Sequence, residues 1–305
     1  MTSMRQGRKH GERMSTETPG QSTANPHHIP CPPGFEENDH LRSAFIRRLT
    51  LLQIERDLVA STGATAGQTE AIPRTLIRYW HDLHGVPTDV RKCLDSWEAL
   101  RDEGVAMHLF DDASARTYIA ERYGQSELAA FDRCRHPAMR SDYLRMCYIL
   151  AEGGLYVDAD DVLVGDGWKD VFRGDTLKLQ PLCYDIKVGG MVAAVELRRV
   201  DLPTEGRIFY VNNNPIAAPA SHPLLRRALA RATDALLGDD PTPEIQSTTG
   251  PGNLTTTLAV YACEVIETGA QPDFELLLNW ESAAETRWDL AYRSDARNWR
   301  NMDHR

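Results

Sequence analysis

The sequence predicts an α/β fold built on a mixed, mostly parallel sheet with added helices. Between Thr75 and Val164, short apolar runs of strand length alternate with segments of helical periodicity. Such alternation favours parallel strands joined by right-handed crossovers. Trp80, Asp111 and the acidic run Asp158–Asp161 stand at the ends of the three strands expected there. Because ligands bind at the carboxyl ends of parallel strands, the sequence predicts the functional site at this edge.

Composition and charge exclude several classes of protein. The chain has 305 residues, of which 42% are hydrophobic and 26% charged, as in an ordinary globular protein. A formal net charge of −10 argues against nucleic acid binding and against a polybasic membrane anchor. No apolar run approaches the roughly 20 residues of a spanning helix, and the N-terminus lacks an apolar signal core. We expect a cytoplasmic protein, either free or peripheral to a membrane.

The cysteines are scattered along the chain, and none forms a C-x-x-C pair. This spacing gives no support to a zinc site or a redox motif. Free, buried thiols in a reducing cytoplasm are therefore expected. The residues are Cys31, Cys93, Cys134, Cys147, Cys183 and Cys263.

The N-terminal part divides into two segments before the main domain. Residues 1–38 are polar, without apolar periodicity, and are predicted to be disordered. Residues 39–68 begin with a helix to about residue 60, capped by Asn38 or Asp39, and end in a Gly/Thr/Ser linker. Residues 69–305 are then predicted to form one domain.

The first elements of this domain are defined by apolar runs and their stop signals. Asp111 and Asp112 stand where a helix begins, and an acidic helix N-terminus explains them without a ligand. Gly104 is read as a helix stop. The predicted strands cover residues 75–80 and 105–110, and the helices residues 86–102, 113–122 and 125–134.

An amphipathic helix from about Ala138 to Glu152 leads into the central acidic run. Gly153-Gly154 ends the helix, and Leu155–Val157 reads as a short buried strand. Three carboxylates between Asp158 and Asp161 would repel one another and be costly to bury unless a cation lies among them. An alternating Asp-x-Asp puts two carboxylates on one side of an extended chain. This pattern suits Mn²⁺ or Mg²⁺ with room for phosphate oxygens.

The C-terminal half shows shorter elements. The loop TTGPGNLT opens a helix to about residue 268, and its free N–H groups suit a phosphate, with a structural cap by Asn253 as the alternative. His222-Pro223 is expected to start a helix through residue 237. Strands are predicted at residues 177–179, 189–195 and 208–211, the last followed by a polar turn, Asn212–Asn214.

The stretch from Ser141 to Asp160 resembles a known region. Ser-Asp-x-x-Arg, a helix and Gly-Gly-x-Tyr-x-Asp-x-Asp are similar to the DXD sugar-binding region of family 32-like glycosyltransferases. That family is related to yeast α-1,6-mannosyltransferase, to capsular polysaccharide enzymes and to the clostridial glucosylating toxins. The resemblance implies a GT-A-like, single Rossmann-type nucleotide-binding domain.

The resemblance also implies roles for three residues. Asp142 would bind hydroxyls of the donor sugar, and Arg145 would lie near sugar and phosphate, which suit its planar guanidinium. The alternative for this pair is a surface ion pair of a few tenths of a kcal/mol. IPRTLIRYWHD resembles the opening stretch of the family, which makes Trp80 the candidate for stacking on the base. The alternative is that Trp80 belongs to the core.

Further site residues follow from the same resemblance. Asp160 is the first choice as metal ligand, and Asp158 would contact ribose and sugar hydroxyls. Asp161 stands where the family has an apolar residue. It would be either a second metal ligand or a solvated side chain without a role in the site. Asn212 in NNNPIAAPASHPLL would bind sugar or simply form a turn. In YRSDARNW, Trp299 would close over the diphosphate.

We therefore expect a metal-dependent glycosyltransferase acting on a UDP- or GDP-sugar with retention of anomeric configuration. A divalent ion would stabilise the charge on the leaving diphosphate. No nucleophile is identifiable, so a front-side path is expected, whereas an inverting enzyme would need a carboxylate base. The acceptor could be a glycan, a small molecule or, as in the toxins, a protein. The alternatives are a non-catalytic nucleotide-sugar and metal-binding module, or a Mg²⁺-phosphate hydrolase.

Overall fold

The computed structural model describes residues 34–35, 37–60 and 71–301. The predicted disorder of residues 1–38 therefore falls almost wholly outside the described residues, as does the linker at 61–68. The helix expected between them is present as α1 (Asp39–Ala60), and Asn38 caps it by accepting a hydrogen bond from the Leu41 amide at 3.1 Å. The division into segments otherwise stays a prediction.

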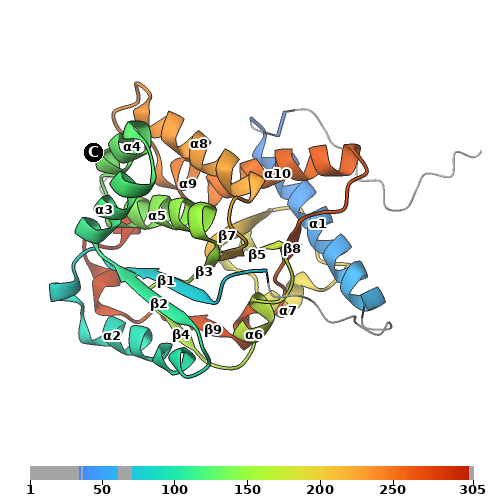
Figure 1. The fold of residues 1–305 in the computed structure, drawn as a ribbon. Helices are drawn as coiled ribbons and strands as arrows, with labels where there is room; N and C mark the ends of the chain where they lie inside the picture. The colour runs from blue at the N-terminus through green and yellow to red at the C-terminus, as the bar shows by residue number, and fades with distance from the viewer. Residues whose placement is uncertain (1–33, 36, 61–70, 302–305) are drawn as a thin grey trace, which may run out of the picture. The chain divides into compact units, whose positions relative to one another are not determined.

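A seven-stranded mixed sheet forms the centre of the described residues (Figure 1). Strands β2, β1 and β3 are parallel, as the sequence predicts, and β7 runs antiparallel to β3 and to β5. Strand β8 (Phe274–Leu276) pairs in parallel with Leu177–Leu179 of β5 and is not part of the main strand order. That order is β2 (Ala106–Phe110), β1 (Thr75–Tyr79), β3 (Gly154–Tyr156), β7 (Arg207–Ala218), β5 (Leu177–Asp185) and β6 (Gly190–Met191). The predicted α/β class with a mixed sheet is confirmed.

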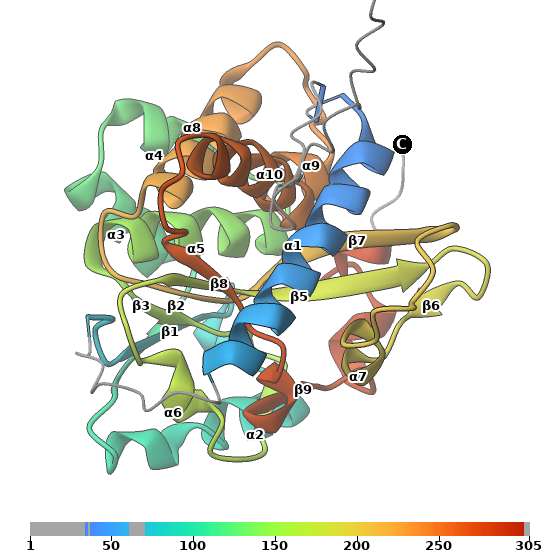
Figure 2. The same ribbon diagram turned by 90° about the vertical axis from the view of Figure 1, so that its right-hand side faces the viewer.

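Helices cover both faces of the sheet (Figures 1 and 2). One face carries α3 (Asp112–Arg122), α4 (Gln125–Arg133), α5 (Pro137–Glu152), α8 (Pro223–Leu237), α9 (Ile245–Thr248) and α10 (Pro251–Glu267). The other face carries α2 (Thr88–Asp95), α6 (Trp168–Val171) and the small sheet of β4 (Asp161–Leu163) with β9 (Ala284–Thr286). Helix α1 packs on β7 and α10, so it is part of the same folded unit.

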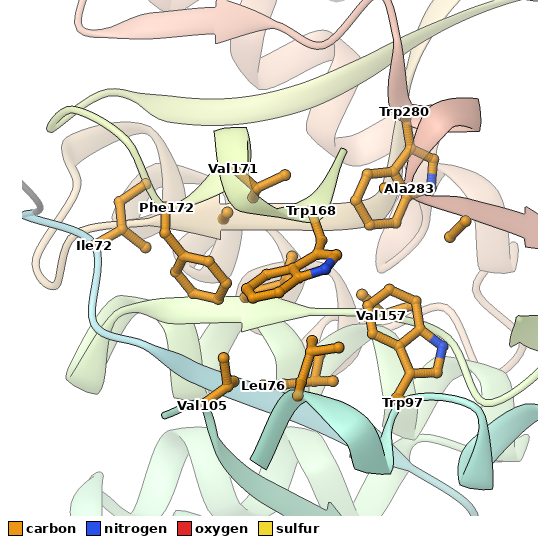
Figure 3. Packing of buried hydrophobic residues seen from close by; sticks show 14 of the residues in the cluster. Ile72, Leu76, Trp97, Val105, Val157, Trp168, Val171, Phe172, Trp280 and Ala283 are labelled. Carbon is orange, nitrogen blue, oxygen red and sulfur yellow. The ribbon is translucent and has the colours of Figure 1, made fainter. Parts of the chain in front are cut away.

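A tryptophan-rich core packs on the face of the sheet that carries α6 (Figure 3). Leu76 of β1 and Val157 after β3 point into it, and the Trp97 and Trp280 rings stack at 6.3 Å between centroids. Trp168 lies between this pair and Phe172, with its ring centroid 6.1 Å from that of Phe172. Large aromatic side chains bury much apolar area each, and this core supports the turn that follows β3.

Helix α5 differs from the expected amphipathic helix because it is buried on nearly all sides. Its apolar residues pack as predicted, but Ser141, Asp142 and Arg145 are buried as well. Polar groups are tolerated in such positions only when they are hydrogen-bonded. The polar stripe of α5 therefore faces an internal hydrogen-bond network at the wall of a cavity and not the outer surface.

The joint between α5 and β3 requires its two glycines. Gly153 has φ of 72° and Gly154 has φ of 109°, where side chains are strained. A Cβ on Gly153 would lie 2.8 Å from the Ala220 amide nitrogen, and one on Gly154 would lie 2.8 Å from the Thr75 carbonyl oxygen. The pair ends the helix, as predicted, and also lets β3 lie directly against β1.

Three element predictions were wrong in detail. The polar turn at Asn212–Asn214 is instead part of β7, because side chains beside the strand bind these amides. The strand expected at residues 189–195 is β6 followed by α7 (Ala194–Leu197). The helix expected at residues 86–102 is α2 followed by the 3₁₀ turn η2 (Glu98–Arg101).

Among the described cysteines four follow the prediction and one does not, while Cys31 lies outside the described residues. Cys93, Cys134, Cys147 and Cys183 are free and buried. Cys263 is disulfide-bonded, which corrects the expectation of free thiols throughout. In the part of the chain that is described, no helix is long and apolar enough to cross a membrane.

Candidate functional site

A cavity of about 1040 Å³ opens at the carboxyl ends of β1 and β3, as the sequence predicts, but neither β2 nor Asp111 after it is among the lining residues. Its wall comes from β1, the acidic turn, α5, the first half of β7, the start of α10 and the C-terminal segment, with further contributions from α1, β6 and α9. Among the predicted site residues, the ones that line it are Trp80, Asp142, Arg145, Asp158, Asp160, Asn212 and Trp299. Asp161 is not among the lining residues.

Arg145 is the centre of the inner wall. Its Nη2 donates to Asp158 Oδ1 at 2.8 Å and lies 3.0 Å from Asp142 Oδ1, and its Nη1 donates to the Asn213 carbonyl at 2.6 Å. The guanidinium carbon lies 4.1 Å from the centroid of the Tyr156 ring. Desolvation alone would lower the pKa of Arg145, but Asp158, Tyr156 and Asp142 raise it above its ordinary value. The surface ion pair considered for Asp142 and Arg145 is wrong, since both side chains are buried.

Asp142 is held from three sides. Asn213 Nδ2 donates to Oδ1 at 2.8 Å, and Thr249 Oγ1 donates to Oδ2 at 3.3 Å. Burial raises the pKa of Asp142 to about 7, against the opposing effects of Arg145 and of these hydrogen bonds. The Nη2 atom of Arg145 lies 2.8 Å from Asp158 and 3.0 Å from Asp142. Because Arg145 is shared between the two carboxylates, it offsets the desolvation of Asp142 only in part.

Asp160 belongs to the opposite side of the site. Tyr292 donates its hydroxyl to Asp160 Oδ2 at 2.6 Å, and Arg293 Nη2 forms an ion pair with the same oxygen. Burial and the negative charge of Asp158 raise the pKa of Asp160, while Arg293 and Tyr292 oppose that shift. Asp158 and Asp160 therefore face the same cavity but have separate partners.

Asp161 is fully buried and does not line the cavity, although both of its side-chain partners do. Thr286 Oγ1 donates to Oδ1 at 2.7 Å, and Asn214 Nδ2 donates to Oδ2 at 2.9 Å. Burial raises the pKa of Asp161 to about 7. The Asn214 side chain also accepts a hydrogen bond from the Asp158 amide at 3.0 Å, so it ties the two ends of the acidic turn together. A solvated bystander is thus the wrong description of Asp161.

Sequence reasoning missed Arg78, which holds the acidic turn from below. Its Nη2 donates to the carbonyls of Asp158 at 2.7 Å and Asp161 at 3.0 Å. The guanidinium is buried over Trp97, and burial lowers the pKa of Arg78 to about 10. The sequence did contain a signal for this role, namely a charged residue within the apolar strand TLIRYW. A buried arginine needs several carbonyl or carboxylate partners, so Arg78 had to contact polar groups of a neighbouring segment.

Trp80 is both a core residue and a residue of the cavity wall, so the two alternatives predicted for it are not exclusive. The ring is 7% exposed and packs edge-on against Tyr292 at 5.3 Å, yet it lines the cavity. Its Nε1 is buried and has no hydrogen-bond partner among the described residues. A buried donor without a partner is costly, and it suits a ligand acceptor here.

The start of α10 also reaches the cavity, through Gly250, Pro251 and Gly252. The proposed cap by Asn253 is wrong, because its Nδ2 donates to the Ala228 carbonyl at 2.9 Å and the helix has no side-chain cap. His222 does start α8 as expected, with Nδ1 accepting from the Leu224 amide at 3.2 Å.

The site fits a divalent ion that is shared with a phosphate ligand. The described residues contain no group of three or more His, Cys, Asp or Glu side chains that could hold a metal by themselves. Asp158 and Asp160 both face the cavity, two residues apart. Mg²⁺ commonly takes one or two carboxylates and completes its shell with water and substrate phosphates. Two cavity-facing carboxylates are therefore compatible with a metal–diphosphate site.

Comparison with known proteins identifies the central part of the chain. Residues 87–173 match the family described as "glycosyltransferase sugar-binding region containing DXD motif". This part is a glycosyltransferase region, and it contains α5, β3 and the acidic turn. Trp80, β7 and the C-terminal segment lie outside it.

Solved structures also match. The chain is similar to "PaToxG Glycosyltransferase", with 15% identity, a TM-score of 0.43 and coverage of 76% of this chain and 84% of that one. It is similar to the ligand-free glycosyltransferase domain of the YGT toxin, with 10% identity, a TM-score of 0.33 and coverage of 70% and 82%. No curated protein matches the sequence.

Proposed function

We propose that the chain is a metal-dependent, GT-A-like glycosyltransferase that moves a sugar from a UDP- or GDP-sugar to an acceptor, with retention of anomeric configuration. The main support is the pairing of Asp158 and Asp160 at one cavity, with the buried Arg145 behind them. This arrangement lies within the region that matches DXD-containing glycosyltransferases.

The acidic side chains and Arg145 each have a defined task in this proposal. Asp160 is the metal ligand, and the metal when bound neutralises the diphosphate as it leaves. Arg145 fixes the orientation of Asp158, which receives ribose and sugar hydroxyls. Asp142, held by Asn213, takes a further hydroxyl. Asp161 is moved from the metal to a supporting role, since both its oxygens already accept hydrogen bonds.

The rest of the donor lies against the remaining walls. Trp80 borders the base, with its unpartnered Nε1 available to an acceptor atom of the nucleotide. Asn212 from β7 and Trp299 from the C-terminal segment border the sugar and the diphosphate. A front-side path, in which the leaving phosphate takes the acceptor proton, needs no further base. The acceptor is a glycan, a small molecule or a protein.

The test is release of nucleoside diphosphate from UDP- and GDP-sugars without acceptor, in Mn²⁺, in Mg²⁺ and in chelator. Asp160→Asn is the loss variant, and Asp166→Asn, at an exposed carboxylate near the same turn, is the matched control. Release from one donor that needs metal, is lost in Asp160→Asn and persists in Asp166→Asn is expected. Equal release by wild type and Asp160→Asn would contradict the assignment.

A non-catalytic binding module is the second candidate, because Arg293 and Tyr292 already engage Asp160. It predicts metal-dependent binding of the donor, measured by calorimetry, with no release from any donor even when candidate acceptors are added.

A further inference from the structure

Arg293 provides the positive charge next to Asp160. Its guanidinium forms an ion pair with Asp160 Oδ2, and its Nε donates to the Arg287 carbonyl at 3.0 Å. The guanidinium carbon lies 4.3 Å from the Trp288 ring centroid and 5.4 Å from that of Tyr292. The side chains of Arg293 and Asp160 are only 16% and 13% exposed, so the pair is largely shielded from water.

The ion pair with Arg293 offsets the repulsion between the carboxylates of the acidic turn. Asp160 lies close to Asp158, and a poorly solvated carboxylate beside another negative charge is unfavourable without a cation. Asp158 has Arg145 as its partner. Asp160 has Arg293, from a segment more than 130 residues further along the chain. A divalent ion at Asp160 would meet a carboxylate whose Oδ2 already has an ion-pair partner.

We propose that Arg293 fills the cation position at Asp160 in the ligand-free protein and that metal binding displaces it, after which the guanidinium pairs with the diphosphate. The inference rests on the proposed function, because it takes Asp160 as the metal ligand. Guanidinium groups bind phosphate through paired N–H donors. Metal and diphosphate should therefore bind with positive coupling: the metal frees Arg293, and the diphosphate gives it a new partner.

The surrounding segment can accommodate such an exchange. Arg293 lies in the short 3₁₀ turn η4 (Ala291–Ser294), and the nearby η5 (Trp299–Asn301) has no buried residue. Between Arg287 and Asn301, the buried residues are Leu290 and Asn298. Segments with few buried contacts rearrange at low free-energy cost. Trp288, 56% exposed and stacked on Arg293, would report the movement.

The experiment measures the affinity for Mn²⁺ by the electron paramagnetic resonance signal of free Mn²⁺, without and with UDP or GDP. Arg293→Gln removes the competing charge. Arg300→Gln is the matched control, because Arg300 also stacks on Trp288, at 5.0 Å, and lines the cavity. Arg293→Lys keeps the charge, and unchanged circular dichroism establishes that each variant is folded.

Arg293→Gln should bind Mn²⁺ alone about tenfold more tightly than wild type, since a hydrogen bond to a charged group contributes roughly that factor. Arg300→Gln should differ from wild type by less than about twofold, as is usual for an exposed charge. The nucleotide should raise Mn²⁺ affinity in wild type more than in Arg293→Gln. In wild type, Mg²⁺ should also change tryptophan fluorescence.

Unchanged or weaker Mn²⁺ binding by Arg293→Gln, or an equal gain in Arg300→Gln, would overturn the exchange. Asp160→Asn in the same assay separates this failure from that of the proposed function. If wild type binds Mn²⁺ and Asp160→Asn does not, only the exchange fails. If wild type does not bind Mn²⁺, or Asp160→Asn binds it equally well, both proposals fail.

Discussion

The two sides of the cavity treat neighbouring carboxylates in opposite ways. On the inner wall, Asp158 is held by the buried Arg145 on α5 and, through its amide, by Asn214 on β7. On the outer side, Asp160 is held by Arg293 from a segment of short, mostly exposed turns. The difference shows that a single acidic turn can combine a carboxylate held by the buried core with one held by a surface segment. The inner wall should contribute to stability, and the outer segment to ligand exchange.

The largest expected effect comes from breaking the inner wall. Arg145→Met would leave Asp142 and Asp158 without their cation in a buried network. The free energy of unfolding should fall by about 3 to 5 kcal/mol, because an uncompensated buried charge is costly. Urea denaturation measures it. Arg293→Met, the matched change in the outer segment, should cost only about 1 to 2 kcal/mol. Equal losses in the two variants would remove the distinction between the two sides.

A second effect concerns pH and Asp142. Burial raises its pKa from 3.8 to about 7, so between these values the folded chain keeps a proton that the unfolded chain has lost. The free energy of unfolding should therefore fall as pH rises through this window, by at most about 1.4 kcal/mol per pH unit for this group. Below pH 3.8 Asp142 is protonated in both the folded and the unfolded chain, so it no longer makes the free energy of unfolding depend on pH.

Urea denaturation across this pH window tests the assignment to Asp142. Asp142→Asn should make the slope shallower and leave the part due to Asp161, whose pKa burial also raises to about 7, whereas Asp166→Asn, at an exposed carboxylate, should keep the full slope. Parallel curves for wild type and Asp142→Asn would show that the titrating group lies elsewhere.

The smallest expected effect is at the outer surface. Trp288→Leu removes a ring that is stacked by Arg293 and Arg300, and exposed cation–π contacts contribute about 0.5 to 1 kcal/mol. The melting temperature should change little. Trp280→Leu, the same substitution in the core beneath the sheet, should lower it strongly because it leaves a cavity. A comparable drop for both would mean that the outer segment is part of the stable core.

The inner wall and Asp160 were largely predictable because these residues are local in sequence. Asp142, Arg145, Asp158 and Asp160 lie within one helix–strand unit, and their spacing alone brings them to one edge of the sheet. The residues missed come from distant parts of the chain. Arg78, Thr286 and Arg293 reach the same turn from β1, β9 and the C-terminal segment.

Asp161 shows most clearly what the sequence pattern predicts and what only the tertiary structure shows. Local alternation could say that it faces away from Asp160, but not what it would meet there. Only the pairing of β4 with β9 and the approach of β7 supply Thr286 and Asn214. The same holds for Asn213, which a turn propensity assigned to a loop and the tertiary structure uses to hold Asp142.

By itself, the chain's amino-acid order determined the helix α5, the glycine joint, the parallel strands and the acidic turn, because each depends on periodicity and backbone geometry over a few residues. The tertiary structure decided which carboxylate faces the cavity and which cation accompanies it. Those choices depend on desolvation and on partners from distant segments, and neither is encoded in local spacing.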